Sequence, residues 1–164
     1  MFHTQLFAAV FVVVFVVPFG AVLQQAGEGK SAQTGSGAQT PIVYSSAKSS
    51  AIRPFSEVVR VGNMLYLSGK LGMDSSGKLA PGGIAAETKQ TLENIRNTLE
   101  GNGSSLDQVV KCTVMMADMK EWAEMNSVYT TFFKTDRRPA RSAFGTTGLA
   151  LNARVEIECI AVLK

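Results

Sequence analysis

Residues 153–162 read ARVEIECIAV, and this stretch decides the fold class. Apolar side chains at positions 155, 157 and 159 alternate with charged side chains at positions 154, 156 and 158. A period of two is typical of a β-strand with one buried face and one open face. The sheet that contains this strand is therefore expected to be covered on one side only, with acidic side chains on the other.

Further strands are predicted upstream of this stretch. Residues 56–61 and 64–68 predict a β-hairpin, because two β-rich runs flank the pair Gly62-Asn63, whose residues tolerate positive φ. Residues 109–117 (VVKCTVMMA) predict a strand with positions 110, 112, 114 and 116 on one face. Residues 142–147 predict the strand that precedes the last one.

Two helices are predicted between the strands. Residues 84–100 place one apolar stripe at steps of three and four, and Gly101 and Gly103 follow as the stop. A second helix is expected after Asp118, with Glu121 three residues later as in a capping box. Its stripe is expected to lie in the core and consists of Trp122, Met125, Tyr129 and Phe132.

The resulting order is ββαβαββ, which indicates an α+β fold in which two helices cover one face of a mixed sheet. The uncovered face carries Glu156 and Glu158, yet it keeps apolar side chains such as Met115. A half-apolar open face usually needs a partner, so we expect an oligomer.

Composition excludes several classes of protein. The net charge is +3 with scattered basic residues, so no basic groove for nucleic acid is indicated. The single histidine, His3, precedes the predicted domain, and no phosphate-binding loop, dinucleotide motif, nucleophile elbow or metal-ligand cluster is present. Cys112 and Cys159 fall in apolar strands, where they are either two core residues or, in an exported chain, a disulfide.

The chain begins with a predicted targeting segment. Residues 1–24 contain an uncharged apolar run from Leu6 to Leu23, which is either a cleaved signal peptide or an uncleaved membrane anchor. Both alternatives predict export to a periplasmic, secreted or lumenal location. Residues 25–50 are rich in Gly, Ser, Gln, Ala and Thr and are expected to form a flexible linker, which leaves residues 51–164 as the folded domain.

Residues 137–144 (RRPARSAF) place Arg141 at the start of a predicted strand. From the residues alone, this arginine is either a surface charge paired with Asp136 or a fixed cation for an anion. Periodicity alone likewise makes Glu156 part of a polar strand face.

Six segments carry a resemblance, in this order: IRPFSEVVRVGNMLYLSGKLGMD, GGIAAETKQTLENI, SSLDQVVKCTVMMADM, MNSVYTTFF, RPARSAF and ARVEIECIAV. They resemble the Rid (YjgF) family of reactive intermediate deaminases over residues 52–162. The resemblance implies a chorismate-mutase-like α+β fold and a homotrimer with clefts between subunits. It also implies an enzyme similar to a 2-iminopropanoate/2-iminobutanoate deaminase. Such enzymes hydrolyse enamines and imines such as 2-aminoacrylate to a 2-keto acid and ammonia, without metal or cofactor.

The resemblance also assigns roles to residues. It implies that Arg141 binds the substrate carboxylate and that Glu156 positions the attacking water. The other members of the implied pocket are Ser68, Gly69, Asn126, the backbone of Ala143, and Phe55.

Three departures from the family pattern keep other functions open. Phe55 replaces a tyrosine and so lacks its hydroxyl, while Arg53 and Lys70 replace a glycine and a glutamine and add two cations. A trimeric protein that binds small carboxylates without turnover is one alternative. The endoribonuclease or translation-inhibitor activity of some members is another, although no nucleic-acid partner is expected here.

Overall fold

The structure is a computed structural model that describes residues 40–45 and 53–164. The predicted targeting segment, residues 1–24, lies outside the described residues. So does the predicted linker over residues 25–50, except for residues 40–45.

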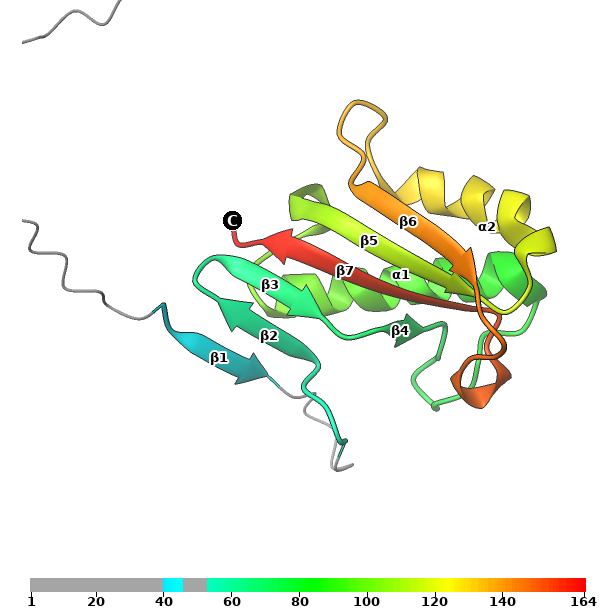
Figure 1. Ribbon diagram of the computed structural model, residues 1–164, viewed down its shortest axis with the longest axis horizontal. Coiled ribbons are helices and arrows are strands. Elements are labelled where there is room, and N and C mark those ends of the chain that lie inside the picture. Colours follow the sequence, from blue (N-terminus) through cyan, green and yellow to red (C-terminus); the bar gives the residue numbers. More distant parts are fainter. Residues whose placement is uncertain (1–39, 46–52) are drawn as a thin grey trace, which may run out of the picture. The chain divides into compact units, whose positions relative to one another are not determined.

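The described chain forms strands and two α-helices, supplemented by single 3-10 turns (Figure 1). The strands are β1 (Ile42–Ser45), β2 (Val58–Val61), β3 (Met64–Leu67), β4 (Lys70–Leu71), β5 (Val109–Met116), β6 (Ala140–Gly145) and β7 (Val155–Val162). The helices are α1 (Gly83–Gly101) and α2 (Trp122–Tyr129).

All strands belong to one sheet with the order β1-β2-β3-β7-β5-β6, and the short β4 also pairs with β7. Strands β5 and β6 are parallel and the other pairs are antiparallel, so the sheet is mixed. The predicted ββαβαββ order is confirmed by β2, β3, α1, β5, α2, β6 and β7.

Strand β1 corrects the predicted start of the folded domain. Residues Ile42–Ser45 pair in register with Val58–Val61 of β2, so part of the predicted linker belongs to the sheet. The reason is local composition, because the run IVYS consists mainly of β-branched and aromatic residues, which favour a strand even next to polar neighbours.

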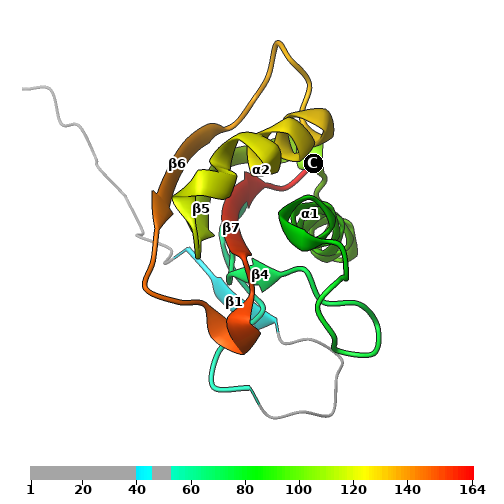
Figure 2. The ribbon, with the colours of Figure 1, turned by 90° about the vertical axis from the view of Figure 1, so that its right-hand side faces the viewer.

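Both helices cover the same face of the sheet, as predicted (Figure 2). The buried core joins α1, α2 and the covered face of the strands, and α1 contributes Ile84, Leu92, Ile95 and Leu99. Strand β5 departs from strict alternation, because its register against β7 shifts between Val109 and Lys111. Val109 is therefore buried and Val110 is 45% exposed, which corrects the predicted placement of Val110 on the same face as Cys112.

The second helix, α2, is flanked by two 3-10 turns, at residues 119–121 and 130–132. Asp118 caps the first of these turns, accepting a hydrogen bond from the backbone N–H of Lys120 at 2.8 Å. The predicted capping box is not formed, because α2 begins after Glu121 without a side-chain cap and the Glu121 carboxylate pairs with Arg154 instead. The predicted core position of Trp122 is wrong: its side chain is 40% exposed, while Met125 and Tyr129 are buried. Trp122 lies in the first turn of α2, where its ring contacts Arg141 instead of the core.

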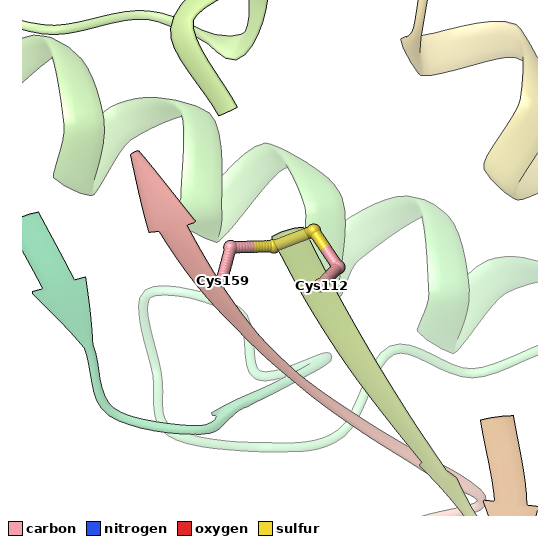
Figure 3. The surroundings of a disulfide bond; sticks show 2 residues. All are labelled: Cys112 and Cys159. Atoms are coloured by element: carbon pink, nitrogen blue, oxygen red, sulfur yellow. A yellow bond between two sulfur atoms is a disulfide. The ribbon is translucent and has the colours of Figure 1, made fainter. Parts of the chain in front are cut away.

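Cys112 and Cys159 form a disulfide between β5 and β7 (Figure 3). The two residues are direct cross-strand partners, with their Cα atoms 4.1 Å apart, and both are buried in the core. Of the two alternatives that the sequence left open, the structure has the paired one.

Candidate active site

Five of the seven predicted site residues line two separate cavities. Phe55, Gly69 and Glu156 line the first, which has a volume of about 430 Å³. Asn126 and Arg141 line the second, which has a volume of about 310 Å³. We call them the Glu156 cavity and the Arg141 cavity.

Glu156 lies against a glycine at the point where the partner of β7 changes from β3 to β4. Its backbone lies opposite Met115 of β5 and Leu71 of β4. Gly69 stands between β3 and β4, and a Cβ atom on it would lie 2.0 Å from Oε1 of Glu156. Glycine at position 69 therefore allows the carboxylate to lie directly on the backbone.

The surroundings of Glu156 disfavour its ionised form. Burial raises the pKa of its carboxyl above the ordinary value of 4.5, and the negative charge of Glu158 raises it further. A carboxylate of raised pKa is a better proton acceptor than an exposed one, which suits a group that accepts a proton from water.

Lys70 and Arg53, the two added cations, both line the Glu156 cavity. The ammonium of Lys70 forms an ion pair with Glu57, and only 12% of the Lys70 side chain is exposed. Thr98 of α1 also donates a hydrogen bond to Glu57 at 3.4 Å. The charge of Lys70 is therefore compensated within the cavity wall.

The Arg141 cavity has an unbalanced positive charge. Arg138 and Arg141 both line it, and its lining includes no acidic residue. Among the described residues, Arg141 makes no salt bridge, so the predicted alternative of a surface pair with Asp136 is not what the structure has. A cavity of this kind favours an anion.

Two aromatic rings contact the guanidinium of Arg141. Its Cζ atom lies 4.5 Å from the ring centre of Tyr129 and 5.8 Å from that of Trp122, both within the range of a cation–π interaction. Burial raises the pKa of Tyr129 to about 12, although the nearby Arg141 charge acts in the opposite direction. Tyr129 is therefore neutral at physiological pH.

Arg141 and Glu156 lie on opposite faces of the sheet. Arg141 is the register partner of Cys112, and Glu156 is the register partner of Met115. Positions 112 and 115 are an odd number of residues apart on β5, so their side chains point to opposite sides. Cys112 faces the helices, which places Arg141 on the covered face and Glu156 on the open one.

Ser68 and Ala143 contribute little side-chain chemistry in this arrangement. The Ser68 hydroxyl donates a hydrogen bond to the backbone carbonyl of Ser56 at 2.7 Å. Ala143 lies on β6, which ends the strand order, and is the register partner of Val114. Neither residue is among those that line the two cavities.

The described residues contain neither a cluster of metal ligands nor a helix suited to cross a membrane. In residues 40–45 and 53–164, no three His, Cys, Asp or Glu side chains lie close enough together to hold a metal ion. Within the same ranges, no helix has the length and apolar character needed to cross a membrane.

Sequence reasoning missed the aromatic contacts of Arg141. Trp122 and Tyr129 are seven residues apart on α2, a spacing that also describes a helix face packed on a core. Contact with Arg141 and packing on the core are distinguished only by the proximity of α2 to β6, and no sequence pattern indicates that proximity.

Comparisons with known proteins identify the family of this chain. The family model described as Endoribonuclease L-PSP matches residues 45–163. A protein of Bos taurus named 2-iminobutanoate/2-iminopropanoate deaminase is 45% identical over 73% of this chain and 88% of its own length, and a human protein of the same name is 42% identical over the same shares. The crystal structure of yeast Mmf1 aligns with a TM-score of 0.70 and 38% identity, covering 76% of this chain and all of Mmf1. The chain therefore belongs to the Endoribonuclease L-PSP family, also known as the YjgF or Rid family.

Proposed function

We propose that this protein hydrolyses small 2-imino acids and their enamine tautomers to 2-keto acids and ammonia. The observation that carries the proposal is Arg141, a guanidinium without a salt bridge in the described chain, in a cavity with no acidic lining. The names of the bovine and human relatives support the same reaction.

The working unit in this proposal contains more than one copy of the chain, and a homotrimer is the expected form. One copy holds Arg141 and Glu156 on opposite faces of its sheet, so the Arg141 cavity of one copy must meet the Glu156 cavity of another. The open face also exposes Tyr66 and Phe144, large apolar side chains that a neighbouring copy would cover.

Arg141 supplies the binding step. Its parallel N–H groups donate two hydrogen bonds to the carboxylate of the imino acid, which fixes the plane of the adjacent C=N group. The second guanidinium at the cavity, Arg138, adds a positive field that attracts the anionic substrate.

Glu156 supplies the proton chemistry. Its carboxylate accepts a proton from water while the water oxygen bonds to the imine carbon, and it then passes that proton to the imine nitrogen, giving a carbinolamine. The carboxylate next transfers the hydroxyl proton of that intermediate to its nitrogen, the C–N bond breaks and ammonia leaves, which forms the keto group. One water is consumed and one ammonia is released for each imine.

The test uses an amino-acid oxidase to generate the imine and semicarbazide to trap it. The wild-type protein is expected to compete with the trap, so semicarbazone forms more slowly. Arg141→Ala is expected to lose about 10- to 100-fold in kcat/KM, since charge-assisted hydrogen bonds to the carboxylate are lost. Arg141→Lys keeps the charge but not the bidentate geometry, so it should recover only part of this loss.

Unchanged semicarbazone formation with the wild-type protein would reject hydrolysis. If calorimetry then detected binding of pyruvate that Arg141→Ala removed, the protein would be a carboxylate-binding member of the family. Phe55 favours that alternative, because it lines the Glu156 cavity without the family's tyrosine hydroxyl.

The family description favours a second candidate, cleavage of RNA. A nuclease assay on single-stranded RNA tests it directly, with Arg141→Ala as the comparison. Cleavage that is retained in Arg141→Ala would be independent of the site described above.

We further propose that the protein works in an oxidising compartment after export. The apolar run at residues 6–23, as a signal peptide or an anchor, supports this, and so does the disulfide between Cys112 and Cys159. Fractionation of cells producing the full chain, with extraction by carbonate and by detergent, separates soluble export from membrane attachment. Recovery of the full-length chain in the cytosol would refute the proposal.

A further inference from the structure

Binding of a carboxylate requires a fixed orientation of the Arg141 guanidinium, and no polar contact of its side chain within the described residues provides it. A bidentate hydrogen bond needs the guanidinium plane held at one angle, yet an arginine side chain has several rotatable bonds. No hydrogen bond or salt bridge from Arg141 to another described residue fixes that plane. The contacts that the structure gives its guanidinium are the rings of Tyr129 and Trp122.

The two rings differ in how they are held. Tyr129 is 3% exposed and packs at 4.8 Å against Phe133, so it is a fixed part of the core. Trp122 is 40% exposed and begins α2, where it forms an outer wall of the Arg141 cavity. Tyr129 thus provides an immobile surface for the guanidinium, and Trp122 limits its movement from the solvent side.

We propose that Trp122 and Tyr129 are positioning residues, which hold the Arg141 guanidinium through their rings and leave its N–H groups to the substrate carboxylate. The inference rests on the proposed function only for the identity of the anion. Rings are suited to this role, because they attract the cation without occupying its hydrogen-bond donors.

The hydroxyl of Tyr129 is not required in this arrangement. It is buried and has no hydrogen-bond partner in the described structure. Tyr129→Phe keeps the ring and removes only an unpartnered group, so it is expected to bind pyruvate as tightly as the wild-type protein does. This variant tests whether the ring or the hydroxyl matters.

Trp122 allows the sharper experiment, because its exposed ring can be replaced with little effect on the core. The full-length protein is titrated with pyruvate by calorimetry, and imine hydrolysis is measured in parallel. Trp122→Leu is expected to raise the Kd for pyruvate about 3- to 5-fold, and Trp122→Phe to recover most of that loss. KM should rise by a similar factor, with kcat changed less than about 2-fold, because a contact with Arg141 is lost before the chemical step.

Tryptophan fluorescence gives a second measure of the contact between Trp122 and Arg141. Trp122 is its single tryptophan and lies 5.8 Å from the guanidinium that receives the carboxylate. Pyruvate is therefore expected to change the tryptophan fluorescence of the wild-type protein along the calorimetric binding curve. Arg141→Ala should abolish the change while the tryptophan remains.

Phe132→Leu is the matched control. The ring of Phe132 contacts Arg96 at 5.1 Å, a cation–π pair of the same kind whose residues do not line the Arg141 cavity. Loss of that ring is expected to leave the Kd for pyruvate unchanged, whatever it does to the unfolding temperature.

The outcomes separate the two proposals. Pyruvate binding with a Trp122 response but no imine turnover would reject hydrolysis and retain the positioning role. Wild-type affinity in Trp122→Leu, an equal loss in Trp122→Leu and Trp122→Phe, or no pyruvate binding by the wild-type protein would each overturn the positioning role.

Discussion

Substitution of Gly69 by alanine is expected to remove activity while leaving the fold almost unchanged. The new Cβ would lie 2.0 Å from Oε1 and 2.8 Å from Cδ of Glu156. Ordinary van der Waals contact begins near 3.4 Å, so the carboxylate must move by at least about 1.4 Å. A displacement of that size at a reacting group is expected to lower kcat/KM about 100-fold.

Stability should change little, because the displaced atoms are the end of a flexible side chain. Gly72→Ala provides the contrast, since its Cβ would lie 2.5 Å from the backbone oxygen and 2.8 Å from the Cα of Glu87. Helix α1 cannot give way as easily, and we expect a loss of about 1–3 kcal/mol in the free energy of unfolding. Gly148→Ala meets no atom within 4 Å and serves as the neutral control.

The assay combines imine hydrolysis with urea unfolding of all three variants. Gly69→Ala should keep the unfolding midpoint of the wild-type protein and lose its activity. Wild-type activity in Gly69→Ala would mean that Glu156 does not act from its position against Gly69, and the proposed chemistry would fail.

Three other perturbations test separate parts of the structure. Because the folded-state pKa of Glu156 is raised, its stabilising contribution is present below the unfolded pKa and is lost as pH rises through the folded value. Glu156→Gln should therefore be more stable than the wild-type protein at pH 7, and equal to it below about pH 4, in urea unfolding at both pH values. Replacing both Cys112 and Cys159 by alanine opens a link between positions 47 apart, and calorimetry should show a loss of up to about 4 kcal/mol. Leu151 has a φ of 58°, which is unfavourable for a residue with a Cβ atom, and it is 62% exposed. Leu151→Gly should therefore increase the free energy of unfolding by about 1 kcal/mol. A decrease would show that the leucine side chain is needed.

Side-chain periodicity predicted the elements correctly where burial of one face determines the sequence pattern. The alternation of residues 155–159 and the stripe of α1 correspond directly to the covered face and the core. Periodicity failed where backbone geometry intervened, since the register shift after Val109 turned Val110 outward. It also failed at β1, because four residues are too few for a period to stand out from a polar neighbourhood.

The candidate site was less accessible from sequence. The resemblance indicated only part of the cavity lining, including Arg141 and Glu156. The placement of these two residues on opposite faces of the sheet depends on the register of β6 and β7 against β5. The pairing of Lys70 with Glu57 likewise joins residues 13 positions apart, whose contact depends on the packing of β4 against the segment before β2. The sequence therefore indicated which side chains form the candidate site, and the strand register determined which of them lie close together within one copy of the chain.

The burial of the Cys112–Cys159 bridge has a consequence for how the protein is made. Packed side chains shield both sulfur atoms, so we expect an oxidant to reach the thiols most readily before the core is packed. A chain that folds first in a reducing environment would retain both thiols and be heavier by two hydrogen atoms. The intact mass of the purified protein thus preserves a record of the redox conditions at the moment it folded.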